Sequence, residues 1–77
     1  MEELGKPKTV KEVFKDYNSN SFELNAAKVI GINLYKKQNI LELNSVSKKP
    51  IDIMAVLDLE KYMQRRFQVR EAKINIT

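Results

Sequence analysis

The sequence predicts a small α+β domain with two layers, in which helices cover one face of a three-stranded sheet. Three observations point to this class: an amphipathic stripe near the start of the chain, two alternating segments in the middle, and a second helical stripe followed by a last alternating segment. The elements come in the order α-β-β-α-β. The chain has 77 residues, which is enough for one domain with a thin core.

The first helix is predicted to begin after Thr9. Thr9 and Glu12 have the spacing of a capping box, in which each side chain binds the backbone N–H of the other residue. Apolar residues follow on one helical face: Val10, Val13, Phe14 and Tyr17. The polar run 18–21 is expected to end the helix, because asparagine and serine side chains compete for backbone hydrogen bonds. Residues 1–8 are expected to be a flexible lead-in, and residues 9–77 a single domain that is the N-terminal module of a longer protein.

A β-hairpin is predicted for residues 28–45, with a turn over residues 36–39. Its apolar residues alternate with polar ones: Ile30, Ile32 and Leu34 in the first strand, and Leu41 and Leu43 in the second. Pairing Leu34 with Leu41 and Ile32 with Leu43 puts both sets on one face, toward the helices, whereas a shift by one residue would turn one set toward water. Gly31 inside a strand indicates a bulge or a close approach by the helix.

A second helix is expected to end near Phe67, but the pattern leaves its start open. Its main stripe points at the sheet: Leu59, Tyr62, Met63 and Phe67. In one alternative a long helix carries Ile53, Met54 and Leu57 on a second, exposed face, which would then be the expected contact with another protein. In the other, slightly favoured alternative, the helix starts near residues 55–58 and these three residues are part of the core. A third strand follows over Ala72, Ile74 and Ile76, parallel to the second.

The composition gives little support to catalysis. The chain has no histidine and no cysteine, which removes the commonest general base, metal ligand and nucleophile. The closest acidic pair is Asp58 and Glu60, but side chains two residues apart on a helix point in different directions. Two glycines cannot build a phosphate-binding loop. The sequence therefore predicts that this chain by itself is not an enzyme and binds no cofactor or metal.

The chain is moderately basic, with a net charge of +4. Because the second helix runs back toward the hairpin tip, five cations are expected to gather there: Lys36, Lys37, Arg65, Arg66 and Arg70. They are candidates for contact with an acidic partner or nucleic acid, although solvated ends of elements are the simpler interpretation. The layout is KH-like, but the chain lacks the GxxG loop with which KH domains bind a nucleic-acid backbone. No segment resembles a signal peptide or a membrane span, so a monomeric cytoplasmic domain is expected.

The segments AAKVIGINLYKKQNILELNSVSKKPI, LEKYMQRRF and AKINI resemble the extreme N-terminal domain of Gram-positive PolC-type DNA polymerase III alpha subunits. The resemblance covers Val10 to Ile76. It implies a non-catalytic, KH-like interaction module, similar to the C-terminal domain of the clamp-loader tau subunit, that docks a replisome protein such as tau. In that family the polymerase, PHP and exonuclease carboxylates lie downstream. The parent chain is thus expected to be a DNA-directed DNA polymerase with 3'-5' exonuclease, and none of its catalytic residues carries over here. The alternative is a small nucleic-acid-binding domain that uses the hairpin-tip cations.

Overall fold

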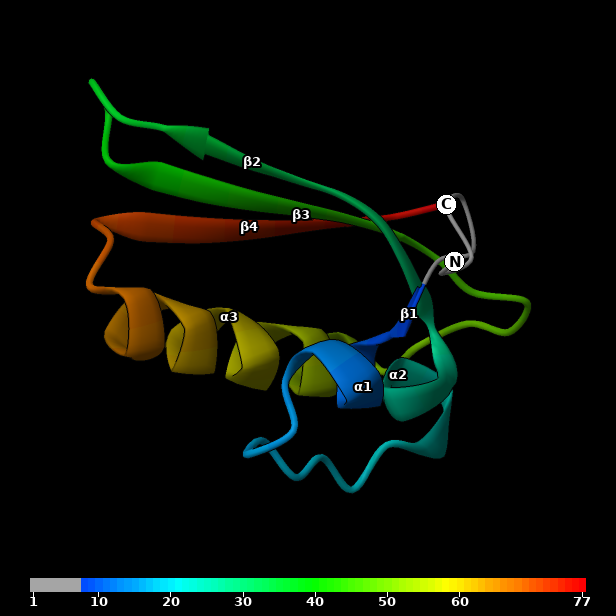
Figure 1. Ribbon diagram of the computed structural model, residues 1–77. Coiled ribbons are helices and arrows are strands. Elements are labelled where there is room, and N and C mark those ends of the chain that lie inside the picture. The colour runs from blue at the N-terminus through cyan, green and yellow to red at the C-terminus, as the bar shows by residue number, and fades with distance from the viewer. Residues whose placement is uncertain (1–7) are drawn as a thin grey trace, which may run out of the picture.

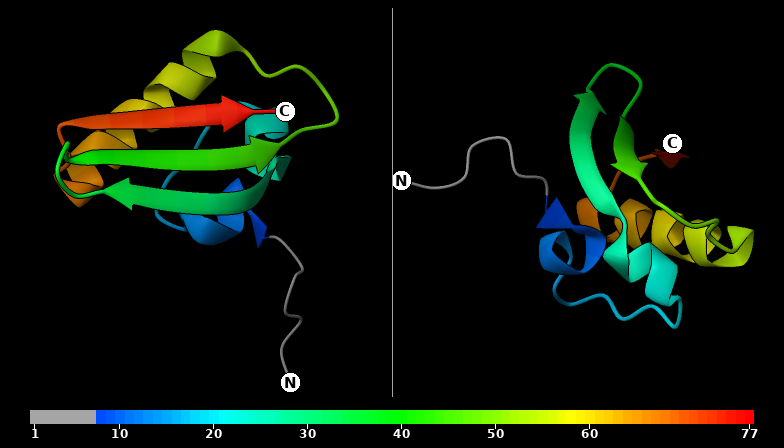
Figure 2. Two further views of the ribbon diagram at one scale, coloured as in Figure 1. Left: turned by 90° about the horizontal axis from the view of Figure 1, so that it is seen from above. Right: turned by 90° about the vertical axis from the view of Figure 1, so that its right-hand side faces the viewer.

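The computed structural model describes residues 8–77, so residues 1–7 of the lead-in expected over residues 1–8 lie outside the described residues. The domain has two layers, a sheet with helices on one side (Figures 1 and 2). The sheet has the strand order β1-β2-β3-β4. In chain order the elements are β1 (Lys8–Thr9), α1 (Val10–Val13), α2 (Phe22–Ala26), β2 (Lys28–Tyr35), β3 (Ile40–Val46), α3 (Ile53–Phe67) and β4 (Glu71–Ile76).

Over the described residues the sheet has four strands, so the prediction of a three-stranded sheet is wrong. The additional strand, β1, pairs antiparallel with the start of β2 and joins Lys8 to Val29 and Thr9 to Lys28. A strand of two residues has no alternation for a sequence pattern to show. Lys8, which was assigned to the lead-in, is therefore part of the sheet. With this strand and the additional helix α2, the predicted KH-like layout is not matched in full.

The capping box at the start of α1 is confirmed. Thr9 Oγ1 accepts a hydrogen bond from the Glu12 N–H at 3.2 Å, and Glu12 Oε1 accepts one from the Thr9 N–H at 2.8 Å. The helix ends at Val13, a turn earlier than predicted, because the backbone leaves helical dihedral angles at Phe14. Phe14 and Tyr17 are buried all the same, so the predicted stripe reaches the core although its second half is not helical.

The polar run after α1 starts a helix that the sequence analysis missed. Ser21 Oγ accepts a hydrogen bond from the Leu24 N–H at 3.1 Å and caps α2. The Asn25 side chain donates to the carbonyl of Ser19 at 3.0 Å and fixes the loop against the new helix. Leu24 is fully buried and is the one buried residue of α2. A helix this short shows no periodicity in the sequence.

The predicted hairpin register is confirmed, since Leu34 pairs with Leu41 and Ile32 pairs with Leu43. The register shifts between Val29 and Gly31, so β2 has a bulge there, which decides between the two interpretations of the glycine. Ile30 is the extra residue of this bulge.

The bulge changes which residue of β2 faces the helices. Val29 packs against the core, while Ile30 is 58% exposed, contrary to the predicted alternation. A side chain on Gly31 would meet Asn44 at an ordinary distance of 3.8 Å, so no helix approaches closely at this point.

The helix α3 is continuous from Ile53 to Phe67, so the favoured alternative of a later start is wrong and the long-helix alternative is confirmed. No glycine or proline interrupts residues 53–67, and exposed apolar residues do not stop a helix. The helix ends at Gln68, which has left-handed backbone angles. From there β4 runs parallel to β3, as predicted.

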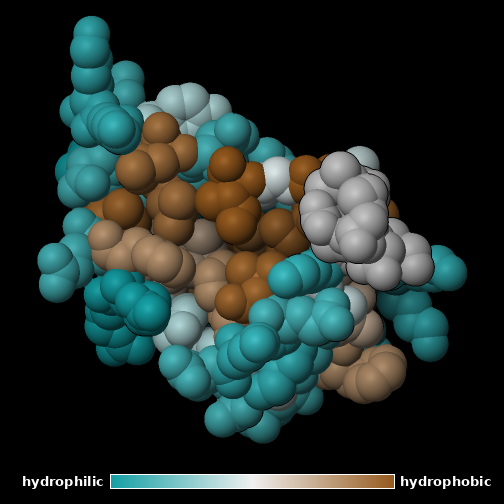
Figure 3. Space-filling model, viewed as in Figure 1, coloured by the Kyte–Doolittle hydropathy of each residue, from teal (hydrophilic) through white to brown (hydrophobic). Residues whose placement is uncertain are grey.

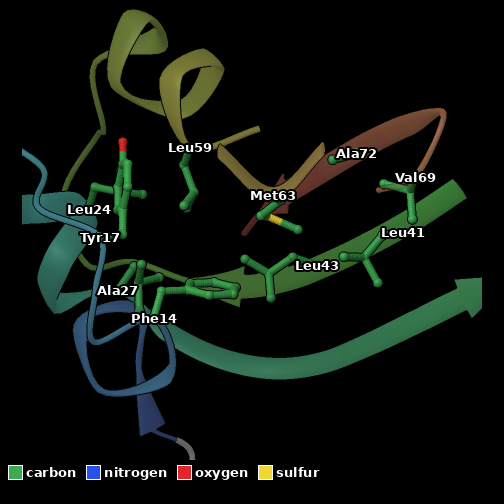
Figure 4. Packing of buried hydrophobic residues seen from close by; sticks show 11 residues of the cluster. Phe14, Tyr17, Leu24, Ala27, Leu41, Leu43, Leu59, Met63, Val69 and Ala72 are labelled. Atoms are coloured by element: carbon green, nitrogen blue, oxygen red, sulfur yellow. The ribbon is translucent and has the colours of Figure 1, made fainter. Parts of the chain in front are cut away.

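The core lies between β3, α3 and the two short helices (Figure 4). Its fully buried large side chains come from four segments of the chain: Val10, Leu24, Leu43, Leu59 and Met63. Phe14 meets the ring of Tyr62 edge to face, with the ring centroids 5.8 Å apart. Phe67, predicted as the last core residue of the stripe, is 44% exposed because it lies at the end of α3, where the helical layer stops.

Candidate functional site

The structure brings the end of α3 to the hairpin tip. The Arg70 backbone N–H donates to the carbonyl of Asn39 at 2.8 Å, and Arg70 Nε donates to the carbonyl of Gln38 at 3.1 Å. Gln64 on α3 donates to the carbonyl of Arg70 at 2.9 Å. Arg70 therefore links the helix end to the hairpin turn, a structural role that the charge pattern did not indicate.

The hairpin turn and the last turn of α3, which carry the other four cations of the expected cluster, lie at the same end of the molecule (Figure 1). Lys36 and Lys37 are exposed in the hairpin turn, and Arg65 and Arg66 are exposed in the last turn of α3. The Arg66 guanidinium lies 5.4 Å from the centroid of the Phe67 ring. This end of the domain thus presents positive charge next to an aromatic side chain.

The second candidate surface, the α3 face, consists of Ile53, Met54 and Leu57. They are 63%, 65% and 43% exposed, respectively, on the first half of α3. Met54 and Leu57 also line a surface hollow of about 370 Å³ between α3 and β4. Glu60 lines the same hollow, and its Oε2 accepts the Ile74 N–H of the edge strand β4 at 2.9 Å.

A third surface was missed by the sequence analysis. It is an apolar hollow of about 350 Å³ between the hairpin and the end of α3, visible as the brown area in Figure 3. We call it the hairpin hollow; its principal walls are Ile32, Leu34, Leu41, Leu43, Met63 and Phe67. Ile32 and Leu34 face the helical layer as predicted but remain 50% and 51% exposed. Alternation indicated the face to which these residues belong, but it carries no signal for whether a helix covers them.

A model of the family described as DNA polymerase III polC-type N-terminus I matches residues 9–77. The chain belongs to this family. The resemblance on which the sequence analysis relied is thereby confirmed. No curated protein and no solved structure matches the chain.

Membership makes this PolC-type domain an N-terminal module of a polymerase, and two of its carboxylates make hydrogen bonds within the fold. Asp58 accepts a hydrogen bond from the Tyr17 hydroxyl at 2.5 Å, and Glu60 is bound to the edge strand. Burial, together with the hydrogen bond and negative charge of Asp58, raises the pKa of Tyr17 to about 12. Among residues 8–77, no group of three or more metal-ligating side chains could hold a metal ion. Within that same range, no helix is long and apolar enough to cross a membrane.

The face of the sheet away from the helices is polar in this PolC-type domain. Glu42 at its centre accepts hydrogen bonds from Asn33 at 3.2 Å, Tyr35 at 3.0 Å and Asn75 at 2.8 Å. These bonds hold the pKa of Glu42 below its ordinary value. The polar groups of this face bind one another, so the apolar surfaces described above lie on other sides of the domain.

Proposed function

We propose that this domain is a non-catalytic interaction module of a PolC-type replicative DNA polymerase and docks another replisome protein, such as the clamp-loader tau subunit. The parent chain would be a cytoplasmic DNA-directed DNA polymerase with 3'-5' exonuclease. The observation that carries the proposal is the α3 face, formed by Ile53, Met54 and Leu57.

The α3 face has no evident role in folding. The first half of α3 is anchored by Val56 and Leu59, which are buried against the rest of the domain. Residues 53 and 57 are one turn apart, so they share a helical side with their neighbour Met54. Small domains seldom leave such a contiguous apolar group in water unless another molecule covers it. Contact with a partner protein therefore explains these side chains better than stability does.

The test is the double substitution Met54→Ser with Leu57→Ser in the full polymerase chain. Binding to immobilised tau subunit, measured by biolayer interferometry, should weaken at least about tenfold. The melting temperature of the domain should stay nearly unchanged, because both side chains are exposed. Phe22→Ser is the matched control, since Phe22 is 75% exposed on α2 and is not among the residues that line the hollows bordered by Met54 and Leu57. Unfolding of the double variant, or unchanged tau binding, would contradict the proposal.

A second candidate function is binding of single-stranded nucleic acid at the hairpin tip. It is favoured by exposed cations in the hairpin turn and at the end of α3, two segments that lie at one end of the domain: Lys36, Lys37, Arg65, Arg66 and Arg70. A titration with single-stranded DNA over a salt series measures it, because each neutralised phosphate should add roughly 0.7 to the slope of log affinity against log salt. Absence of binding at about 50 mM salt would remove this candidate.

A further inference from the structure

The helical layer does not cover the whole sheet. α1 ends at Val13, and α1 and α2 lie beneath the start of β2, while α3 crosses beneath β4 and β3 at an angle and ends at the hairpin tip (Figures 1 and 2). Between α1 and the end of α3, the second half of β2 therefore has a stretch with no helix directly beneath it. Ile32 and Leu34 face this gap and remain half exposed, and Phe67 at the end of α3 borders it. The hairpin hollow occupies the place of a missing helix.

The size and lining of the hairpin hollow suit apolar side chains. Its volume is about 350 Å³, and a cavity of roughly 150 Å³ can hold a benzene ring. It therefore has room for about two large apolar side chains. Asn39 is the one polar residue among those that line it. An amphipathic helix supplies such anchors from residues three or four apart on one face.

The end of the hollow nearest the hairpin tip is positively charged. Arg66 stacks over Phe67, which lines the hollow, and Lys36 and Lys37 follow directly after β2. Glu71, the acidic residue next to Arg70, lines the hollow between α3 and β4 and is not among the residues that line the hairpin hollow. At the opposite end, the exposed Lys15 and Asp16 carry charges of opposite sign. An occupant with acidic residues beside its apolar anchors would complement this rim.

We propose that the hairpin hollow is a second docking site and that its occupant is an acidic amphipathic helix of another protein. The site is separate from the α3 face and does not depend on the role proposed for that face. A second copy of the chain is a poorer occupant, because it would bring its own net charge of +4 to a basic rim. Nucleic acid is also a poorer occupant, because most lining residues of the hollow are aliphatic and Asn39 is the one polar residue there that could bind a base edge.

An added β-strand is the remaining geometric alternative. Over the described residues, β1 pairs only with the first two residues of β2, which leaves the later edge of β2 unpaired. The bulge at Ile30 bends this edge. A strand placed on the edge would extend the sheet without filling the space beneath it. The helix fills that space, so it accounts for the half-exposed Ile32 and Leu34.

The test is a selection of helical peptides on the full chain that carries this domain. A phage library of peptides of about 15 residues, roughly four turns, would vary apolar residues on one face and Glu, Lys, Gln and Ser on the other. At the varied polar positions of the selected peptides, Glu should be at least about ten times as frequent as Lys, because the rim is positively charged. Leu34→Glu should weaken their binding at least about 30-fold, the loss typical of an interface hot spot. Ile30→Glu, on the same strand outside the hollow, should leave binding unchanged.

The charged rim has its own matched pair of variants. The double variant Lys36→Glu with Lys37→Glu should bind the selected peptides more weakly. The double variant Lys48→Glu with Lys49→Glu, beyond the other end of the hairpin, should bind them as tightly as the unaltered chain does. Methyl NMR spectra of the unaltered chain give a readout that needs no folded variant. Added peptide should shift the methyl signals of Leu34 and leave those of the α3 face in place.

Several results would overturn the proposal. These are the absence of enriched peptides, a preference for Lys, full binding to Leu34→Glu, or methyl shifts confined to the α3 face. Displacement of the peptides by single-stranded DNA whose own binding Leu34→Glu abolishes, or dimers in sedimentation that Leu34→Glu dissociates, would assign the hollow to another occupant. Tau binding by the Met54 and Leu57 double variant tests only the proposed function, and peptide binding by Leu34→Glu tests only the hairpin hollow. The two proposals can therefore fail separately.

Discussion

Truncation of Leu43 to alanine should show how much of the stability rests on the centre of the sheet. Leu43 is fully buried on β3, whereas its cross-strand partner Ile32 is half exposed. Leucine-to-alanine changes at fully buried sites cost about 2–5 kcal/mol, the sum of lost transfer free energy and the cavity left behind. Because Leu43 borders the hairpin hollow, the new space would join an existing one. We therefore expect about 3 kcal/mol, in the lower half of that range.

This loss is large for a chain of 77 residues, whose total free energy of unfolding should be about 4–12 kcal/mol. Urea unfolding followed by far-UV circular dichroism would measure it. With a slope of about 1 kcal/mol per molar urea, the midpoint should fall by about 3 M. Leu34→Ala is the comparison, because Leu34 is 51% exposed and buries about half a side chain, worth about 1 kcal/mol. Equal losses for the two variants would refute the assignment of Leu43 to the core and Leu34 to an open surface.

Two further predictions concern Tyr17 and Gly31. The pKa of Tyr17 is raised from 10.0 to about 12, so the stability that its neutral hydroxyl contributes should be fully present below about pH 10 and lost as the pH rises from 10 toward 12. An ultraviolet titration of the tyrosines should find one group near pH 12 that Asp58→Asn shifts downward; an unchanged titration would contradict this. Gly31→Ala should be neutral or stabilise the domain by up to about 1 kcal/mol in urea unfolding, because a Cβ there meets only Asn44 at 3.8 Å. A clear loss of stability would show that the bulge requires glycine.

The sequence was sufficient for the elements that are long enough to show a period. The hairpin register, the parallel last strand and the capping box followed from alternation and spacing, and the structure confirms them. The two elements that were missed, β1 and α2, have two and five residues and owe their existence to neighbours. β1 exists because β2 offers an edge to it, and α2 because Ser21 caps it. Such contacts leave no periodic trace in the sequence.

The candidate surfaces were less predictable, because exposure depends on where neighbouring elements stop. Periodicity identified two apolar faces on the second helix but could not decide whether the first of them was helical. The hairpin hollow is bordered by Val13 and Phe14, where α1 ends a turn earlier than the sequence predicts. After that point Lys11 Nζ donates to the carbonyl of Tyr17 at 3.2 Å and to Asn18 Oδ1 at 2.7 Å, which holds the chain in a loop. These bonds span six and seven residues, a range that local propensity does not describe.

The two proposed docking surfaces share α3 but lie at its opposite ends. Met54 and Phe67 are thirteen positions apart, which corresponds to about 20 Å along a helix axis. A short partner helix seated between Leu34 and Phe67 would leave the α3 face open, so one occupant does not exclude the other. On the opposite face of the sheet, the side chains of Asn33, Tyr35 and Asn75 donate hydrogen bonds to Glu42. If both proposals hold, the domain can contact two proteins at once, which is a useful property for a module at the end of a polymerase that works within a larger assembly.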